Sequence, residues 1–123
     1  NIDFFAYSPL SFGILCIDPD KEENKEKSFI RNALFENYKK PTYELRRCLK
    51  RIANQRSVSQ AQVAINWCCY QGVIPLVGMR NKSQVIDISN VFKWNLNKNE
   101  FKVLQEFSKK CLKKMPKNPF SSI

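Results

Sequence analysis

The order of the predicted elements makes this an α/β chain with parallel strands. Apolar runs suited to buried strands occupy residues 2–7 and 73–77, and each is followed by a turn signal. Between them, apolar residues recur at helical spacing. A strand that returns to a strand through helices is a βαβ unit, whose strands pair in parallel. Parallel sheets are buried on both faces, so two strands alone suggest the end of a larger domain.

Composition excludes several classes of protein and of site. The chain has 123 residues, 43% hydrophobic and 26% charged, which suits one globular unit. No apolar run is long enough to cross a bilayer, and the first residues do not resemble a signal peptide. Five cysteines without a C-x-x-C pair predict a reduced, cytoplasmic chain. The absence of histidine excludes histidine general-base chemistry, Ser-His triads and histidine-based metal sites within this chain. We predict no metal-binding residues.

The net charge of +10 has two possible interpretations, a phosphate-binding surface or solvated helix faces. Basic residues cluster in 39–56 and 98–117, and both stretches read as helices. A basic helical face can bind phosphates. Lysine-rich helices also solvate themselves and cover apolar surface with their side-chain stems. No aromatic-interleaved motif accompanies the charge, so we expect solvated helix faces and no binding of nucleic acid.

The first half of the chain leads from a strand into helices. The strand at 2–7 ends at Ser8 and Pro9, and the weak periodicity of residues 10–27 predicts a long loop. A short helix is predicted at 28–38. Pro41 and Thr42 then open a second helix, whose apolar face consists of Leu45, Cys48, Leu49, Ile52 and Ala53.

The second half carries clear helix-capping signals. Ser59 and Gln62 form a predicted capping box for a buried helix at 60–70, which Gly72 ends. Asn81 is expected to cap a helix at 82–90, and Asn97 a last helix followed by an extended tail from Met115. The predicted apolar face of that last helix is Phe101, Leu104, Phe107, Cys111 and Leu112. The adjacent Cys68 and Cys69 are expected to serve packing.

Two motifs at strand-to-loop transitions carry a family resemblance. The first is A-Y-S-P-L-S-F-G-I-L at residues 6–15. The second is V-S-Q-A-Q-V-A-I-N-W at 58–67, followed by Q-G-V-I-P-L-V-G-M-R-N-K-S-Q at 71–84. In this order and about 50 residues apart, they resemble the C-terminal part of the aldo-keto reductase family, closest to its bacterial and potassium-channel β-subunit branch. The likeness runs from Phe4 to about Phe107.

The resemblance implies a fold and a cofactor site. Residues 1–123 would be the C-terminal part of a TIM (β/α)8 barrel, from strand 7 to the closing helices, with its active site at the carboxyl ends of the strands. The implied ligand is NADP(H). Tyr7 would stack on the nicotinamide, Arg31 would reach the phosphates, and Arg80 would meet the 2′-phosphate of the adenosine. The remaining cofactor-binding residues would be Ser8, Pro9, Leu10, Gly78, Gln84 and Asp87.

Each of these residues also has a structural interpretation. Tyr7 could be an ordinary strand-end aromatic and Arg80 a solvated loop arginine, while Gln84 and Asp87 could be polar residues of a first helical turn. The chain also departs from the family pattern. It has C-I-D-P at residues 16–19, where the family often has T-G-K-Y, so a lysine near the cofactor phosphates is missing. Asp87 and Ile88 stand where the family has Glu and Asn.

The implied activity is the reduction of aldehydes and ketones to alcohols by an NADPH-dependent oxidoreductase. The family's catalytic Asp, Tyr, Lys and His belong to the first half of the barrel and are absent here, so the chain alone is expected to be inactive. Two alternatives stay open: a non-catalytic nucleotide-binding regulatory protein of the same fold, and a basic helical binder of nucleic acid or of an acidic partner. We expect no membrane partner, and we expect the isolated chain to self-associate.

Overall fold

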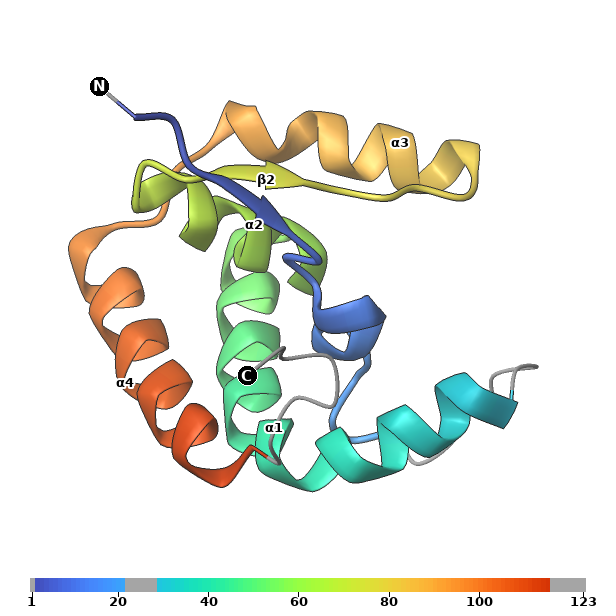
Figure 1. The fold of residues 1–123 in the computed structure, drawn as a ribbon. Coiled ribbons are helices and arrows are strands. Elements are labelled where there is room, and N and C mark those ends of the chain that lie inside the picture. The colour runs from blue at the N-terminus through green and yellow to red at the C-terminus, as the bar shows by residue number, and fades with distance from the viewer. Residues whose placement is uncertain (1, 22–28, 116–123) are drawn as a thin grey trace.

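The computed structural model describes residues 2–21 and 29–115, with a small parallel sheet and a larger helical part (Figure 1). Within helix α1, the side chains of residues 29–32, 34 and 35 lie outside this description. The elements, in order, are β1 (Phe5–Tyr7), the 3-10 helix η1 (Ser11–Cys16), α1 (Phe29–Arg56), α2 (Gln60–Tyr70), β2 (Ile74–Leu76), α3 (Lys82–Ser89), the 3-10 helix η2 (Asn90–Lys93) and α4 (Lys98–Lys114). None of the described helices is long and apolar enough to span a bilayer.

The two strands pair in parallel, which confirms the predicted βαβ connection. Phe5 lies opposite Ile74, and Tyr7 lies opposite Leu76. Each strand has three residues, fewer than the predicted runs at 2–7 and 73–77. The described residues contain no third strand, so the flanks of each run have little to pair with. One further ladder bond runs from the Ile74 N–H to the Phe4 carbonyl at 2.9 Å.

The sheet is covered on one face. Ala6 and Pro75 are half-buried, and α2 packs against β2. Side chains alternate between the faces of a strand, so Phe5, Tyr7, Ile74 and Leu76 share the opposite face. All four are exposed. The described part of the chain therefore leaves one apolar sheet face uncovered.

Helix α1 is a single helix with Pro41 inside it, so the prediction of two separate helices was wrong. It bends sharply, and Figure 1 shows its first part running across the molecule and its second part rising toward the sheet. Proline lacks an N–H and clashes with the preceding turn, which bends a helix. The Thr42 hydroxyl donates to the Tyr38 carbonyl at 2.6 Å, and Arg46 Nη2 donates to the Lys39 carbonyl at 2.8 Å. These side chains satisfy carbonyls at the bend, so the helix continues through it.

The region after β1 is also more ordered than predicted. Residues 11–16 of the expected long loop form η1, whose Ile14 is buried. The rest of that loop, from residue 22 to 28, lies outside the described residues.

The three predicted helix caps are confirmed. The side chains of Ser59, Asn81 and Asn97 accept hydrogen bonds from the backbone N–H three residues later, at 3.1, 3.0 and 2.8 Å. At Asn97 the box is reciprocal, because the Glu100 carboxylate accepts the Asn97 N–H at 2.8 Å. At Ser59 only the cap forms, so the predicted capping box was half wrong. The Gln62 side chain bonds Asp87 and Trp94 instead.

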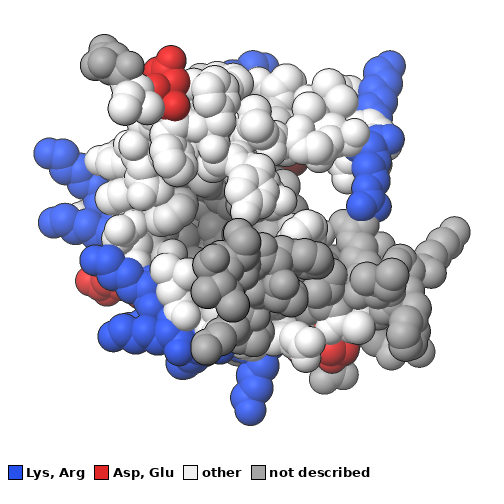
Figure 2. All heavy atoms as spheres, in the orientation of Figure 1, with Lys and Arg blue, Asp and Glu red and all other residues white. Residues whose placement is uncertain are grey.

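The core lies where α1, α2 and α4 meet. Its buried residues are Cys48, Leu49, Ile52, Ala53, Val63, Ala64, Leu96 and Leu104. On α4, Leu104 and Cys111 are buried, but Leu112 is 69% exposed, so its place on the predicted apolar face was wrong. One residue beyond Cys111, the helix has turned by about 100° and faces solvent. The lysines of α4 lie on that exposed side, along the left edge of the molecule in Figure 2.

Candidate functional site

The candidate site lies at the carboxyl-terminal edge of the sheet. Because β1 and β2 run in parallel with Tyr7 opposite Leu76, the segments that follow both strands start from the same edge. Tyr7 is 80% exposed there. Ser8 is also exposed, whereas Pro9 and Leu10 are half-buried and Leu10 packs against the core. The edge therefore offers an aromatic ring and a short polar segment to a ligand.

The backbone after β1 is strained. Ser8, Ser11 and Phe12 have φ values of 51°, 49° and 59°, a left-handed conformation that L-residues with side chains avoid. Each such residue costs roughly 1–2 kcal/mol. The turn is held by the Ser11 N–H, which donates to the Ser8 carbonyl at 2.9 Å, and by the Gly13 N–H, which donates to the Leu10 carbonyl at 2.9 Å. Strain of this kind clusters at functional sites, which singles out this loop.

The segment after β2 is open and positively charged. A Cβ built on Gly78 would meet no atom within 4 Å, so a ligand has room to approach this backbone. The Arg80 N–H donates to Gln84 Oε1 at 2.7 Å. The Arg80 side chain is exposed, and no carboxylate of the described chain pairs with its guanidinium. Arg80 is thus free to meet an anion at this edge.

The carboxylate of Asp87 accepts hydrogen bonds from other side chains of the protein. Its Oδ2 accepts a hydrogen bond from the Ser59 hydroxyl at 2.6 Å, and its Oδ1 accepts one from Gln62 Nε2 at 2.7 Å. Gln62 in turn accepts the indole N–H of Trp94 at 3.0 Å. This network fastens α3 to α2. Asp87 and Gln84 therefore both have structural roles, and their contact with an adenosine stays a prediction.

Arg31 lies in the first turn of α1, and its side chain is outside the described residues. The contact of Arg31 with the cofactor phosphates therefore stays a prediction.

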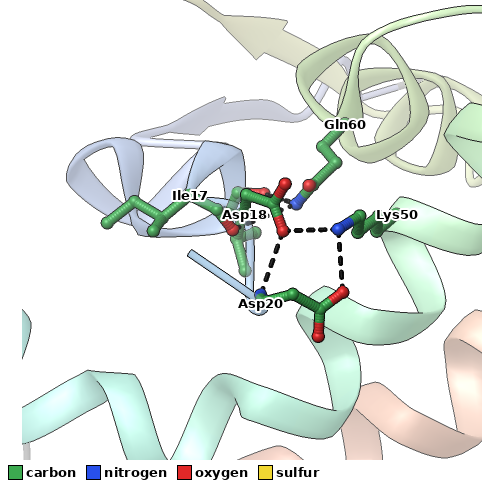
Figure 3. Close-up of polar contacts among 6 residues, drawn as sticks. Ile17, Asp18, Asp20, Lys50 and Gln60 are labelled. Carbon is green, nitrogen blue, oxygen red and sulfur yellow. Dashed lines mark hydrogen bonds and ion pairs between the residues drawn. The ribbon is translucent and has the colours of Figure 1, made fainter. Parts of the chain in front are cut away.

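The acid at the position of the missing lysine is neutralised by a lysine from elsewhere. Lys50 of α1 donates to Asp18 at 2.6 Å and to Asp20 at 2.8 Å (Figure 3). The bond from Lys50 lowers the pKa of Asp18, and the two carboxylates raise the pKa of Lys50. Gln60 Nε2 holds the same segment by donating to the carbonyls of Leu15 and Ile17, at 2.9 and 3.3 Å.

Sequence reasoning missed this ion pair because Lys50 and Asp18 lie 32 positions apart. The basic and acidic runs were visible, but no local pattern connects them.

The described residues contain neither a reactive thiol nor a cluster of metal ligands. The five cysteines are free, and burial chiefly raises the pKa of Cys68 to about 11. Burial of the sulfur, then the charge of Asp87, raises the pKa of Cys16 to about 11 although the residue keeps some exposed surface. Such thiols stay protonated at neutral pH. Within residues 2–21 and 29–115, no cluster of acidic or cysteine side chains could hold a metal ion.

Comparison with known proteins gives a family match and two relatives. Residues 1–109 match the sequence profile of the aldo/keto reductase family. The chain is 31% identical to the chloroplastic pyridoxal reductase of Arabidopsis thaliana over 99% of its own length. It is 23% identical, over 86% of its length, to a Saccharomyces cerevisiae protein named as an aryl-alcohol dehydrogenase. It spans 33% and 32% of these relatives, about a third of each.

Proposed function

Because this chain belongs to the aldo/keto reductase family, whose fold is a TIM barrel, we propose that residues 1–123 form the C-terminal part of such a barrel. In this proposal β1 is the seventh strand, β2 is the eighth, and the helices after β2 close the domain. The short parallel sheet with one uncovered apolar face fits two strands that need neighbours. The intact protein is an oxidoreductase that reduces aldehydes or ketones to alcohols with NADPH.

The residues at the sheet edge fit a dinucleotide. Bound NADPH supplies a hydride to the carbonyl carbon of the substrate. Tyr7 would stack against the nicotinamide with its exposed ring, and Ser8, Pro9 and Leu10 would line the ribose and diphosphate. Those residues lie in the strained loop.

The second segment would hold the other end of the cofactor. Gly78 leaves space for it, and Arg80 would bind the 2′-phosphate with its planar guanidinium. Arg31, Gln84 and Asp87 complete the proposed set; for Asp87 to contact adenosine, its carboxylate would have to share its bonds to Ser59 and Gln62.

One observation carries this proposal: the parallel register starts the exposed Tyr7 segment and the unpaired Arg80 segment from the same sheet edge. An aromatic ring at the end of β1 and a free guanidinium in the segment after β2 suit a ligand with a flat ring and a phosphate.

The test is cofactor selectivity in the intact protein. Arg80→Ala should weaken NADPH roughly 10- to 150-fold, because a hydrogen bond to a charged group contributes about 1.5–3 kcal/mol. NADH, which lacks the 2′-phosphate, should lose far less. Lys82→Ala removes a nearby charge as the matched control, and fluorescence titration measures both cofactors. Equal losses for NADPH and NADH would sink the assignment.

The substrate is proposed from the relatives' names. One relative is named for pyridoxal and the other for aryl alcohols, so aromatic aldehydes are the first substrates to assay. The 123-residue chain alone should reduce none of them, because the family's Asp, Tyr, Lys and His proton-transfer group is not among its residues. Turnover that co-purifies with this chain and is lost in Tyr7→Ala would overturn that expectation. We further propose that the protein works in the cytoplasm.

A regulatory protein that binds the nucleotide without chemistry is the second candidate. The C-I-D-P segment favours it, since Asp18 and its ion pair with Lys50 stand where the family often has a lysine near the phosphates. An intact protein that binds NADPH but reduces no carbonyl compound would select this alternative.

A further inference from the structure

A groove apart from the sheet edge lies between α1 and α4. Both helices run below the sheet in Figure 1. The two helices pack along each other and leave a groove of about 480 Å³. Arg47, Arg51 and Asn54 line it from α1, and Phe107 lines it from α4. None of these residues belongs to the candidate cofactor site at the sheet edge. The volume lies within the usual range for small-molecule sites, about 300–1,000 Å³.

Two guanidinium groups in this groove have no carboxylate partner in the described chain. Arg47 lies over the ring of Tyr43 at 5.9 Å, and Arg51 Nη2 lies 3.9 Å from the sulfur of Cys48. Neither contact neutralises a positive charge. Two other cations of α1 have carboxylate partners: Lys50 binds Asp18 and Asp20, and Arg56 binds both oxygens of Glu100. The contrast marks Arg47 and Arg51 as free to bind an anion.

The groove lining carries three cations, Arg47, Lys50 and Arg51, and two carboxylates, Asp20 and Glu44, and Lys50 binds Asp18 as well as Asp20. Asp20 lines the groove but is held by Lys50, which leaves Glu44 as the lining carboxylate without a cation. Lys110 of α4 lies 5.4 Å from the centre of the ring of Phe107, which lines the groove. Figure 2 shows further basic side chains along the left edge of the molecule. Arg47 and Arg51 are therefore the lining cations that are available to a negatively charged ligand.

We propose that this groove binds a small phosphate-bearing molecule, with Arg47 and Arg51 holding its phosphoryl group. The two residues are one helical turn apart, about 5–6 Å between their Cβ atoms, so both can reach one phosphoryl group. A guanidinium donates two parallel hydrogen bonds to phosphate oxygens. Asn54, a further turn along the same face, offers an amide to the rest of the ligand, and Phe107 offers an apolar surface.

The probe is phenyl phosphate, titrated calorimetrically into the intact protein while saturating NADPH fills the proposed cofactor site, with inorganic phosphate as the minimal ligand. We expect saturable binding of one molecule per chain. Arg47→Gln and Arg51→Gln should each weaken it at least about tenfold, as expected for loss of a charge-assisted bidentate contact. Glu44→Gln should tighten it severalfold, because it removes the unpaired negative charge.

Lys82→Gln on α3 is the matched control, since it also removes one positive charge outside the groove, and it should leave the affinity unchanged. Arg80→Ala should also leave it unchanged, which separates this site from the cofactor site.

The proposal is overturned if the Lys82→Gln control weakens binding as much as the groove variants do, or if no saturable binding occurs. It is also overturned if an oligonucleotide or an anionic vesicle binds while phenyl phosphate does not. Should an arginine variant fail to fold, Glu44→Gln still decides, because an unchanged affinity in that variant contradicts a phosphate held in this groove.

Discussion

Two helices of this chain end in the same backbone motif with different residues at its left-handed position. After α1, the Ser57 N–H donates to the Asn54 carbonyl and the Val58 N–H to the Ala53 carbonyl, at 3.3 and 3.0 Å. After α2, Gly72 and Val73 repeat the pattern with Cys69 and Cys68. The φ values are 54° at Ser57 and 72° at Gly72. Glycine adopts this conformation freely, whereas serine is strained in it.

Ser57→Gly should therefore stabilise the protein by about 1 kcal/mol, because it removes the left-handed strain. Urea denaturation followed by circular dichroism measures the change. Gly72→Ser is the mirror-image control and should lower the free energy of unfolding by a similar amount. A loss of stability in Ser57→Gly would mean that the serine side chain contributes more than its backbone strain costs.

Glu100 links a helix cap to an ion pair. Its hydrogen bond with Arg56 chiefly, and the Asn97 N–H as a further contribution, lower its pKa from the ordinary 4.5. A lowered folded-state pKa stabilises the protein above the ordinary value, and this stabilisation disappears as the pH falls through the folded-state value. Because Arg56 is partly exposed, screening keeps the ion pair's contribution small, about 0.2–1 kcal/mol.

Glu100→Gln should consequently lower stability near neutral pH, and this effect should fade as the pH falls below 4.5 and through the lowered pKa of Glu100. Glutamine keeps a side-chain acceptor for the Asn97 N–H, so the variant removes the charge and not the cap. Glu100→Ala removes both and should cost more at every pH. Thermal unfolding across the pH range measures the difference, and a Glu100→Gln effect that did not vary with pH would contradict the ion-pair explanation.

At the scale of elements, the bend of α1 depends on a buried arginine. Arg46 is 4% exposed, and its Nε donates to the Thr42 hydroxyl at 3.1 Å while Nη2 donates to the Lys39 carbonyl at 2.8 Å. Pro41 bends the helix and removes one backbone donor. The guanidinium thus gives the Lys39 carbonyl and the Thr42 hydroxyl a donor beside the proline.

Arg46→Leu should destabilise the protein by about 1–3 kcal/mol, since it removes the donor to the buried bend and leaves polar groups there unpaired. Arg47→Leu, its exposed neighbour, is the matched control for stability and should change it little. Chemical denaturation of the two variants gives the comparison. Equal stability in Arg46→Leu and the unaltered protein would show that water or a backbone rearrangement supplies hydrogen bonds to the Lys39 carbonyl and the Thr42 hydroxyl.

At the scale of the whole molecule, the uncovered sheet face dominates the behaviour of the chain on its own. Phe5, Tyr7 and Leu76 are 55%, 80% and 52% exposed on that face. Burying a large apolar side chain contributes roughly 1.5–3 kcal/mol, so covering several of them outweighs a typical domain's net stability. The strands also have open edges in the described structure, which favour pairing with another chain.

The 123-residue chain should therefore self-associate at micromolar concentration. Sedimentation velocity measures its size, and Phe5→Ser combined with Leu76→Ser should shift it toward the monomer by removing apolar area. A stable monomer that unfolds cooperatively and binds no apolar dye would contradict this expectation.

The position of the candidate site could be predicted from the sequence, because it follows from the order of the strands. The Tyr7 and Arg80 segments follow two apolar runs joined by helices, and parallel pairing then brings the two segments to one edge. The hydrogen bond that the Asp87 carboxylate accepts from Ser59 could not be predicted from the sequence, because Ser59 caps another helix, 28 positions away. The anion groove was not readable either. It needs Phe107 of α4 to lie against the Arg51 face of α1.

The sequence by itself determined the features whose causes lie within a few residues: the helix starts at Ser59, Asn81 and Asn97, and the stop at Gly72. It also determined the parallel strand pair, because a strand that returns to a strand through helices pairs in parallel. Caps and helix stops act through adjacent backbone groups, so their pattern is legible along the chain. Only the tertiary structure decided that Arg46 bridges the bend of α1, that Lys50 neutralises Asp18, and that Arg47 and Arg51 keep their charge unpaired. Each depends on which side chains packing brings together and on which counter-charges it leaves out of reach.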